Sequence, residues 1–484
     1  MSAGTRAAFE TVIGLEVHVQ LSTRTKMFCG CAVEFGAPPN TRTCPVCLGL
    51  PGSLPVLNRR AVDLGIRTAL VLDCRIHSES QFHRKNYYYP DLPKNYQISQ
   101  YQYAAHPPLA TEGVLIVDTA GGSRSIRIRR VHLEEDTGKL VHAQGRSLVD
   151  YNRSGTPLLE AVTEPDIRSP EEARLFLTRL RATLQYAGVT TGRMEEGTLR
   201  CDANLSLRMP GGPHGTRTEV KNMNSLRSVE RALRFEEARQ REVLAHGEGV
   251  VQETRHWDEQ RGVTFASREK EEAQDYRYFP EPDLVPIRVD EPWVAHVRAD
   301  LPELPEARRR RYIEMFGLAE HDAGLVTATR AMAEFFEEAV RLYPRPKIVS
   351  NWLVGDIAAY LNAKGLEIED TAVRPAHLAE MLRLMDAGTL SGRMAKEVLE
   401  EMLGTGRAPG EIVRERGLVQ ISDEARLSQL VEDVIAEHPG PVADVRAGRD
   451  KAVAFLVGQV MKKTKGRANP EMVNRLLRDR IGGG

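Results

Sequence analysis

The sequence is poor in the features that mark secreted, membrane-spanning or strongly basic proteins. Its six cysteines among 484 residues are too few for a disulfide scaffold. No uninterrupted apolar run approaches the roughly 18 residues that span a bilayer, and the first ten residues, MSAGTRAAFE, lack the apolar core of a signal peptide. Because 66 Lys and Arg nearly balance 67 Asp and Glu, the total charge does not indicate a nucleic-acid partner. We therefore expect a cytoplasmic protein with reduced thiols and no membrane partner.

The periodicity of the first 290 residues predicts strands interrupted by helices. Residues 13–19 and 202–207 alternate apolar and polar side chains, as half-buried strands do. A helix is predicted to begin at 169–172, where an N-cap serine precedes a proline and a capping-box glutamate. A second helix is predicted after Ser225, ending near Gly247.

The composition changes towards the C-terminus. Prolines cluster at 280–282 and 301–305, which suits a domain junction. Beyond about residue 306 the pattern is helical, and 404–410 is a second expected joint. The last 39 residues, 446–484, hold ten Lys or Arg against three Asp or Glu, a net charge of +7. Such a patch is suited to phosphates, although a solvated helical face is the alternative.

Four of the cysteines lie close together. Cys29 and Cys31 are followed, after a 12-residue loop, by Cys44 and Cys47. Two close pairs suit a tetrahedral zinc site, because each pair can span one edge of the tetrahedron; four unliganded thiols are the alternative. A site with four thiolates leaves no position for water, so zinc here is expected to be structural.

Acidic residues occur on three separated segments. Glu16 and His18 share a face of one expected strand, 134–136 is a run of three carboxylates, and Asp202 lies on the polar face of its own strand. This set indicates a divalent metal site or a general acid/base pair, although most acidic strand residues merely face water. The imidazole suits Mn²⁺ better than Mg²⁺. The alternation does not decide which glutamate of the run points inward.

Two further segments are candidates for binding. Residues 82–103 interleave basic and aromatic side chains, and two lysines among them, Lys85 and Lys94, suit a polar channel better than a core of ordinary tyrosines. The chain has neither a GxxxxGK[ST] nor a GxGxxG phosphate motif. The turn at 152–157 carries donors that could hold phosphate, although a plain turn is the alternative. The candidate ATP contacts are Asn152, Arg153, Ser154 and Thr156.

Several long segments together resemble one family. They are VIGLEVHVQL, FHRKNYYYPDLPKNYQISQ, HLEEDTGKL, DYNRSGTPLLEAVTEPDIRSPEEA, MEEGTLRCDANLSLR, TEVKNMNSLRSVERAL and DYRYFPEPDLVP. These segments look like the B subunit of tRNA-dependent aspartyl/glutamyl-tRNA amidotransferases (GatB). The segment FLVGQVMKKTKGRANPEMVN resembles the small C-terminal domain of that family. The resemblance runs from about residue 11 to the end.

The resemblance implies an ATP-dependent carbon–nitrogen ligase. In that family the B subunit phosphorylates the side-chain carboxylate of Glu-tRNA(Gln) or Asp-tRNA(Asn). Ammonia that an amidase (A) subunit releases from glutamine then gives Gln-tRNA(Gln) or Asn-tRNA(Asn). A small C subunit completes a heterotrimer, and the non-discriminating synthetase is a further partner. Which misacylated tRNA is used depends on the synthetases that coexist with the enzyme.

The resemblance also implies roles for single residues. Glu16, His18, Glu135 and Asp202 match the catalytic Mg²⁺ site, with Glu134 beside it. Lys85 and Lys94 fall on positions of the ammonia path. The four cysteines match a zinc site present in part of the family. The expected tRNA contacts are Lys462, Lys463, Lys465 and Arg467.

The implied fold is of mixed α/β (α+β) class, with an antiparallel-sheet cradle, a helical domain and a basic helical tail. We expect these domains at 1–290, 291–405 and 406–484. A non-catalytic, zinc-stabilised tRNA-binding subunit that presents substrate to the amidase is the alternative. The acidic cluster argues against it, because a binder of polyanionic tRNA gains nothing from four carboxylates in its cleft.

Overall fold

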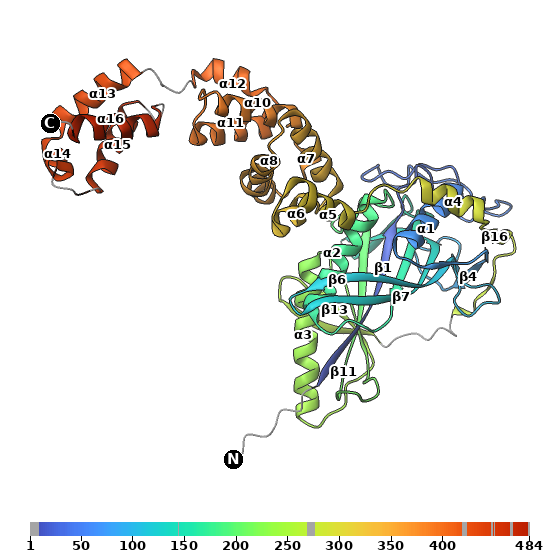
Figure 1. Ribbon diagram of the computed structural model, residues 1–484. Helices are drawn as coiled ribbons and strands as arrows, with labels where there is room; N and C mark the ends of the chain where they lie inside the picture. Colours follow the sequence, from blue (N-terminus) through green and yellow to red (C-terminus); the bar gives the residue numbers. More distant parts are fainter. Residues whose placement is uncertain are drawn as a thin grey trace, which may run out of the picture. The chain divides into compact units, whose positions relative to one another are not determined.

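The chain forms two compact units, Met1–Leu304 and Pro305–Gly484, in a computed structural model (Figure 1). The structure describes residues 9–143, 145–268, 276–418, 424–446, 449, 451–464 and 468–482. The first unit is built on a β-sheet and the second consists of helices. This confirms the predicted class. In the described part of the chain, no helix has the length and apolar character needed to cross a membrane.

One sheet of twelve strands, counted among the described residues, organises the first unit. Its strands are β1 (Glu10–Gln20), β2 (Arg75–Ile76), β4 (Phe82–Asn86), β5 (Tyr96–Gln100), β6 (Ala110–Thr119), β7 (Gly122–Glu135), β10 (Pro157–Thr163), β11 (Leu199–Arg208), β12 (Thr218–Lys221), β13 (Thr254–Asp258), β14 (Val263–Arg268) and β15 (Phe279–Pro280). The order is β14-β13-β12-β11-β1-β10-β7-β5-β4-β15, with β6 paired to β7 and β2 to β6. The pairings are antiparallel except for β12 with β13. Two small antiparallel pairs join β3 (Glu79–Ser80) to β16 (Ile287–Arg288) and β8 (Lys139–Ala143) to β9 (Arg146–Asp150).

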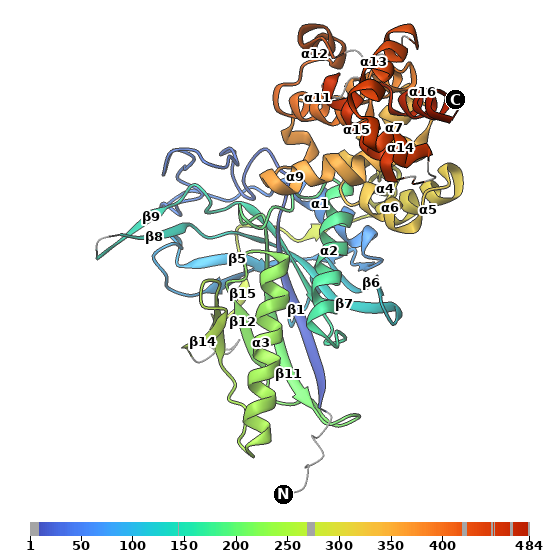
Figure 2. The same cartoon turned by 90° about the vertical axis from the view of Figure 1, so that its left-hand side faces the viewer.

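Helices cover the apolar face of this sheet. They are α1 (Arg59–Val71), α2 (Pro170–Tyr186) and α3 (Leu226–Ala245), and α4 (Glu291–Ala299) packs on α1. Figure 2 shows α2 and α3 in front of the sheet, with α3 running alongside β11; α3 contacts β11 and α2 contacts β6. Alternate residues of β1, such as Leu15 and Val17, are buried in this core. Because side chains alternate across a strand, the residues between them face the other side of the sheet.

The helix starts follow the capping chemistry of the sequence. The hydroxyl of Ser169 accepts a hydrogen bond from the amide of Glu172 at 3.1 Å, with proline at the first position of α2. The carboxylate of Glu172 accepts from the amide of Arg168, so only half of the predicted capping box forms. Ser225 caps α3 through the amide of Ser228 at 3.0 Å. Both predicted helices are confirmed.

The first unit extends to Leu304. Helix α4 belongs to it, because α4 contacts α1 and Val297 is part of the apolar core. This helix lies beyond residue 290, where the sequence predicted the cradle to end.

The second unit is a succession of short helices. They are α5 (Pro305–Phe316), α6 (Glu320–Val326), α7 (Arg330–Leu342), α8 (Pro346–Trp352), the π-helical turn η2 (Leu353–Ile357), α9 (Ala358–Lys364), the short turn η3 (Ile368–Asp370), α10 (Pro375–Asp386), α11 (Gly392–Thr405), α12 (Pro409–Arg416), α13 (Glu424–Glu437), α14 (Pro439–Arg446), α15 (Lys451–Lys463) and α16 (Pro470–Gly482). Helices α13 to α16 share a core of their own. Val349, Leu353, Ile357 and Leu361 recur every four residues and are all buried. The wide turn of η2 keeps this spacing on one face, since a spacing of four drifts around an α-helix of 3.6 residues per turn.

Candidate active site and metal centre

The polar face of the central sheet gathers acidic and histidine side chains from four strands. On β1, Glu16 and His18 alternate with the buried apolar residues. The register places Glu16 opposite Asp202 of β11 and His18 opposite Glu160 of β10. Directly paired residues on one face lie close enough for their side chains to interact. Glu134 reaches the same cluster from β7.

His18 is the centre of this cluster. Its Nε2 lies 3.3 Å from Glu160 Oε2, 3.4 Å from Glu134 Oε1 and 3.9 Å from Glu16 Oε1. Burial opposes a charged imidazole, but the hydrogen bond with Glu160 and the charges of Glu134, Glu160 and Glu16 raise the pKa of His18 to about 9. In the absence of a metal, His18 is therefore a cation among carboxylates.

The carboxylates of the cluster differ in their surroundings. The charge of Glu160, with burial, raises the pKa of Glu16. Burial opposes ionisation of Glu160, but the charge of His132 and the hydrogen bond with His18 hold the pKa of Glu160 well below its usual range. Asp202 accepts a hydrogen bond from Lys221 Nζ at 2.6 Å. A cation bound among these carboxylates would offset the repulsion that raises the pKa of Glu16.

Two overlapping groups could hold a metal ion. Glu16, His18 and Asp202 each offer a ligand atom, and these atoms lie within 4.8 Å of one another; the same holds for His18, Glu134 and Glu160. Carboxylate oxygens suit Mg²⁺ and an imidazole suits Mn²⁺ as well. The donors are therefore suited to a divalent cation.

Glu135 lies apart from this cluster. Its carboxylate pairs with Lys94 and accepts a hydrogen bond from the amide of Ile98 at 2.9 Å. Glu134 and Glu135 are neighbours on β7, and consecutive side chains of a strand point to opposite faces. The expected ligand set of Glu16, His18, Glu135 and Asp202 is thus not gathered in one place. Glu134 is the glutamate that reaches His18.

Lys94 and Glu135 line a cavity of about 190 Å³. Both side chains are almost fully enclosed. The cavity is also lined by residues of the segment 29–49 that carries the four cysteines, here called the cysteine loop, among them Cys29, Cys47 and Gly49. The Lys94–Glu135 pair and the cysteine loop therefore line the same cavity.

Lys85 is not among the residues that line this cavity and lies near Glu134. Its ammonium is 4.8 Å from the ring centre of Tyr276 and 5.9 Å from that of Tyr87. Burial opposes the charge, but the groups around it, Tyr278 and Glu134 first among them, raise the pKa of Lys85. Only Tyr87 of these rings belongs to the aromatic segment predicted from the sequence; Tyr276 and Tyr278 come from a later part of the chain.

The turn at 152–156 uses its polar groups within the protein. The Asn152 amide donates to the carbonyl of Pro38 at 2.8 Å, and Arg153 donates to the carbonyls of Thr137 and Gly138. Ser154 and Thr156 are buried. A role in binding ATP stays a prediction for these four residues. The hydrogen bonds from Asn152 to the carbonyl of Pro38 and from Ser154 to the carbonyl of Cys47 hold the turn against the cysteine loop.

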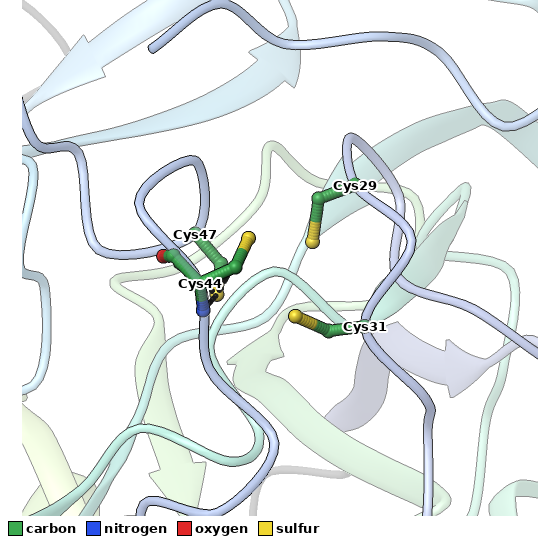
Figure 3. Close-up of side chains that lie close together, drawn as sticks. All are labelled: Cys29, Cys31, Cys44 and Cys47. Atoms are coloured by element: carbon green, nitrogen blue, oxygen red, sulfur yellow. Dashed lines mark hydrogen bonds between the residues drawn. The ribbon is translucent and has the colours of Figure 1, made fainter.

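The four clustered cysteines converge from the two ends of the cysteine loop (Figure 3). The sulfur atoms of Cys29, Cys31, Cys44 and Cys47 lie within 4.8 Å of one another, and those of Cys44 and Cys47 are 3.9 Å apart. A tetrahedron with Zn–S bonds of about 2.3 Å needs sulfurs roughly 3.8 Å apart. The amide of Cys44 also donates to Cys47 Sγ at 3.1 Å. The cluster could hold a metal such as zinc.

A buried lysine accompanies the cysteines. Lys26 is fully buried, with its ammonium 3.6 Å from Cys47 Sγ and 3.2 Å from the carbonyl of Tyr151. The thiol of Cys29, together with Lys26, lowers the pKa of Cys47 to about 4. A buried ammonium requires a nearby anion, so Lys26 fits a set of thiolates better than a set of neutral thiols.

The tail residues are only partly described. Lys462 and Lys463 are exposed at the end of α15, and Lys463 pairs with Glu437 at 2.6 Å. Lys465 and Arg467 lie outside the described residues.

Sequence reasoning missed two members of the polar cluster, Glu160 and His132. His132 Nε2 lies 3.6 Å from Glu134 and 3.7 Å from Glu160, both at Oε2, and Glu160 also pairs with Arg130 at 2.9 Å. The only local signal for Glu160 was a single carboxylate inside the apolar run 157–163.

Comparison with known proteins identifies the family. Residues 11–295 match the GatB/GatE catalytic domain, and residues 334–481 match the GatB domain. The chain is 56% identical over 478 residues to the B subunit of the aspartyl/glutamyl-tRNA(Asn/Gln) amidotransferase of Moorella thermoacetica, covering 98% of this chain and 100% of that protein. It is 54% identical over 480 residues to the corresponding protein of Carboxydothermus hydrogenoformans, which has the same name, covering 98% and 99%. The resemblance of the motifs is thereby confirmed: the chain belongs to the family of aspartyl/glutamyl-tRNA(Asn/Gln) amidotransferase B subunits.

Proposed function

We propose that this chain, part of a ligase of the amidotransferase class, activates the side-chain carboxylate of Glu-tRNA(Gln) or Asp-tRNA(Asn) with ATP and then amidates it. The amidase (A) subunit supplies ammonia from glutamine, and a small C subunit completes a cytoplasmic heterotrimer. The observation that carries the proposal is the cluster of Glu16, His18, Glu134, Glu160 and Asp202 on the polar face of the sheet.

The chemistry needs a group that neutralises phosphate charge while a carboxylate oxygen attacks the terminal phosphorus of ATP. A bound Mg²⁺ would supply that neutralisation, held by Glu16, His18 and Asp202 with Glu134 and Glu160 beside them. Lys221 and His132 orient these carboxylates by ion pairs. ADP leaves, ammonia attacks the acyl carbon, and phosphate leaves as the amide forms.

Lys94 and Lys85 suit the delivery of ammonia. Lys94 pairs with Glu135 in the cavity next to the cysteine loop, and Lys85 lies within the tyrosine rings near Glu134. In this proposal the two lysines line the path by which ammonia reaches the activated carboxylate. Polar, enclosed walls pass a neutral amine and limit water, which would hydrolyse the acyl phosphate.

The proposal also assigns roles to the zinc site, the helical part and the basic tail. Zinc on the four cysteines is structural, because four thiolates leave no open position. The chain has a cradle that does the chemistry, a helical middle part and a basic tail from about residue 406 that contacts tRNA through Lys462, Lys463, Lys465 and Arg467. A non-catalytic tRNA-binding role is disfavoured by the carboxylates of the cluster, which repel a polyanion.

The test is ADP formation by the assembled complex, with Glu-tRNA(Gln) and Asp-tRNA(Asn) supplied separately. We expect ADP release that requires a misacylated tRNA and a divalent cation. ADP release that is the same with uncharged tRNA would contradict the proposal.

A further inference from the structure

The segment that carries Cys44 and Cys47 packs directly against Lys94. Gly49 lies two residues beyond Cys47 and has φ +66°, which side chains rarely adopt. A Cβ atom at Gly49 would overlap Cγ of Lys94 and come within 3.2 Å of its Cα and Cβ. The glycine is therefore required both for the backbone conformation and for the close approach to Lys94.

The same segment is held rigidly to the cysteines. The amide of Leu48 donates to the carbonyl of Cys44 at 3.1 Å, and that of Gly49 donates to the carbonyl of Val46 at 3.1 Å. The position of Gly49 thus follows the positions of Cys44 and Cys47.

The first cysteine pair reaches Lys94 as well. Phe28, next to Cys29, has its ring centre 5.9 Å from the ammonium of Lys94, and the ring centre of Tyr96 lies 5.4 Å from the same ammonium. A cation beside aromatic rings is attracted to them. Both halves of the four-cysteine site therefore contact the lysine that pairs with Glu135.

We propose that Gly49 is a positioning residue for Lys94. In this proposal the cysteine loop, closed by its metal, forms the wall of the cavity that holds Lys94 against Glu135. The loop thereby sets how efficiently ammonia passes from the amidase to the activated carboxylate. This inference rests on the proposed function of Lys94 in the ammonia path. It assigns to the metal centre a second role besides stability.

The first test does not depend on activity. Lysines of the assembled complex are labelled briefly with an amine-reactive reagent, and Lys94 is quantified by peptide mass spectrometry relative to the exposed Lys364. Labelling of Lys94 should rise at least threefold in Gly49→Ala and in wild type stripped of metal by a chelator. Unchanged labelling in both samples would overturn the inference.

A matched control separates the contact from backbone strain. Gly52 has φ +83° with nothing within 4 Å of an added Cβ, so Gly52→Ala carries similar strain without the contact. We expect Gly52→Ala to label like wild type, and both variants to retain zinc. Equal labelling of Lys94 in the two variants would show that strain, not the contact with Lys94, is responsible, and would overturn the inference.

The second test measures the coupling between glutamine hydrolysis and amidation of the tRNA-bound amino acid. The ratio of amidated tRNA formed to glutamine hydrolysed should fall at least threefold in Gly49→Ala and stay unchanged in Gly52→Ala. With ammonium chloride in place of glutamine, Gly49→Ala should amidate within twofold of wild type. An unchanged ratio would contradict the inference. A wild-type complex that forms no amide from either donor would instead contradict the proposed function, while the labelling result would still decide the position of Lys94.

Discussion

Glu134 and Glu135 are neighbours on β7, but their carboxylates lie at two different sites. Glu134 Oε1 lies 3.4 Å from His18 Nε2 on the polar face of the sheet, whereas Glu135 pairs with Lys94 in the enclosed cavity. The antiparallel pleat alone separates them. One dipeptide therefore joins the proposed site of carboxylate activation to the proposed ammonia path.

Asp202→Asn should abolish ADP formation while glutamine hydrolysis by the partner continues. Asp202 lies on a strand whose apolar face is in the core, so the change should leave folding intact. Asparagine keeps one carbonyl oxygen but loses the charge that holds a hard cation. We expect a fall on the order of 10² or more in the rate of ADP formation.

Asp166→Asn is the matched control for this experiment. Asp166 forms an ion pair with the exposed Arg127 away from the cluster. Its substitution should change neither rate. Normal, metal-dependent ADP formation by Asp202→Asn would remove Asp202 from the site.

Cys44→Ser should release zinc and lower the thermal stability of the chain. Structural zinc contributes directly to folding free energy, and serine is a poor ligand for it. Metal analysis should find about one zinc per wild-type chain and a marked loss in the variant. Cys74→Ser, which lies outside the cluster, should keep the zinc. A wild-type protein whose melting temperature does not change on removal of metal would contradict a structural role.

The pH dependence of stability should report the charge of His18 in metal-free protein. The pKa of His18 is raised from 6.5 to about 9, so its stabilising contribution is fully present below about pH 6.5 and lost as the pH rises through 9. The contribution is up to about 3 kcal/mol. His18→Gln should therefore lower the free energy of unfolding more at pH 6 than at pH 9.5.

Denaturant unfolding with chelator present measures this difference. His77, whose pKa is lowered by burial, should give the opposite slope when it is replaced by Gln. An equal cost of His18→Gln at both pH values would mean that His18 is not charged in the folded protein.

Replacing Lys462 and Lys463 by Gln should weaken tRNA binding more than it slows chemistry. Removing one lysine–phosphate interaction should lower the slope of log affinity against log salt by roughly 1, and the KM for tRNA should rise several-fold. Lys396→Gln is the control, because Lys396 pairs with Asp356 elsewhere in the second unit. An unchanged KM for the double variant would show that these lysines do not contact tRNA.

Much of the site was accessible from local sequence patterns. The period of two on residues 13–19 put Glu16 and His18 on one face, and the spacing of the cysteines brought Cys29, Cys31, Cys44 and Cys47 together. Ser169 and Ser225 fixed the starts of two helices. Each of these signals lies within a single element or loop.

The missed features depend on contacts between segments that are distant in the sequence. Glu160 joins His18 only because β10 lies beside β1 in one particular register, and His132 follows from β7 beside β10. The β7–β10 register also shifts between Val162 and Thr163, so counting along the strand does not fix it. Gly49 meets Lys94 through a loop contact that no periodicity encodes.

The most direct test of carboxylate activation follows an oxygen atom from the side-chain carboxylate of the substrate into the phosphate that is released. Glu-tRNA(Gln) labelled with ¹⁸O in the side-chain carboxylate is converted by the complex with ATP and glutamine, and the inorganic phosphate is analysed by mass spectrometry. If the carboxylate oxygen attacks the phosphorus of ATP and the C–O bond breaks when ammonia enters, each phosphate released should carry one ¹⁸O. Amide formation with unlabelled phosphate would contradict activation of the carboxylate by this chain.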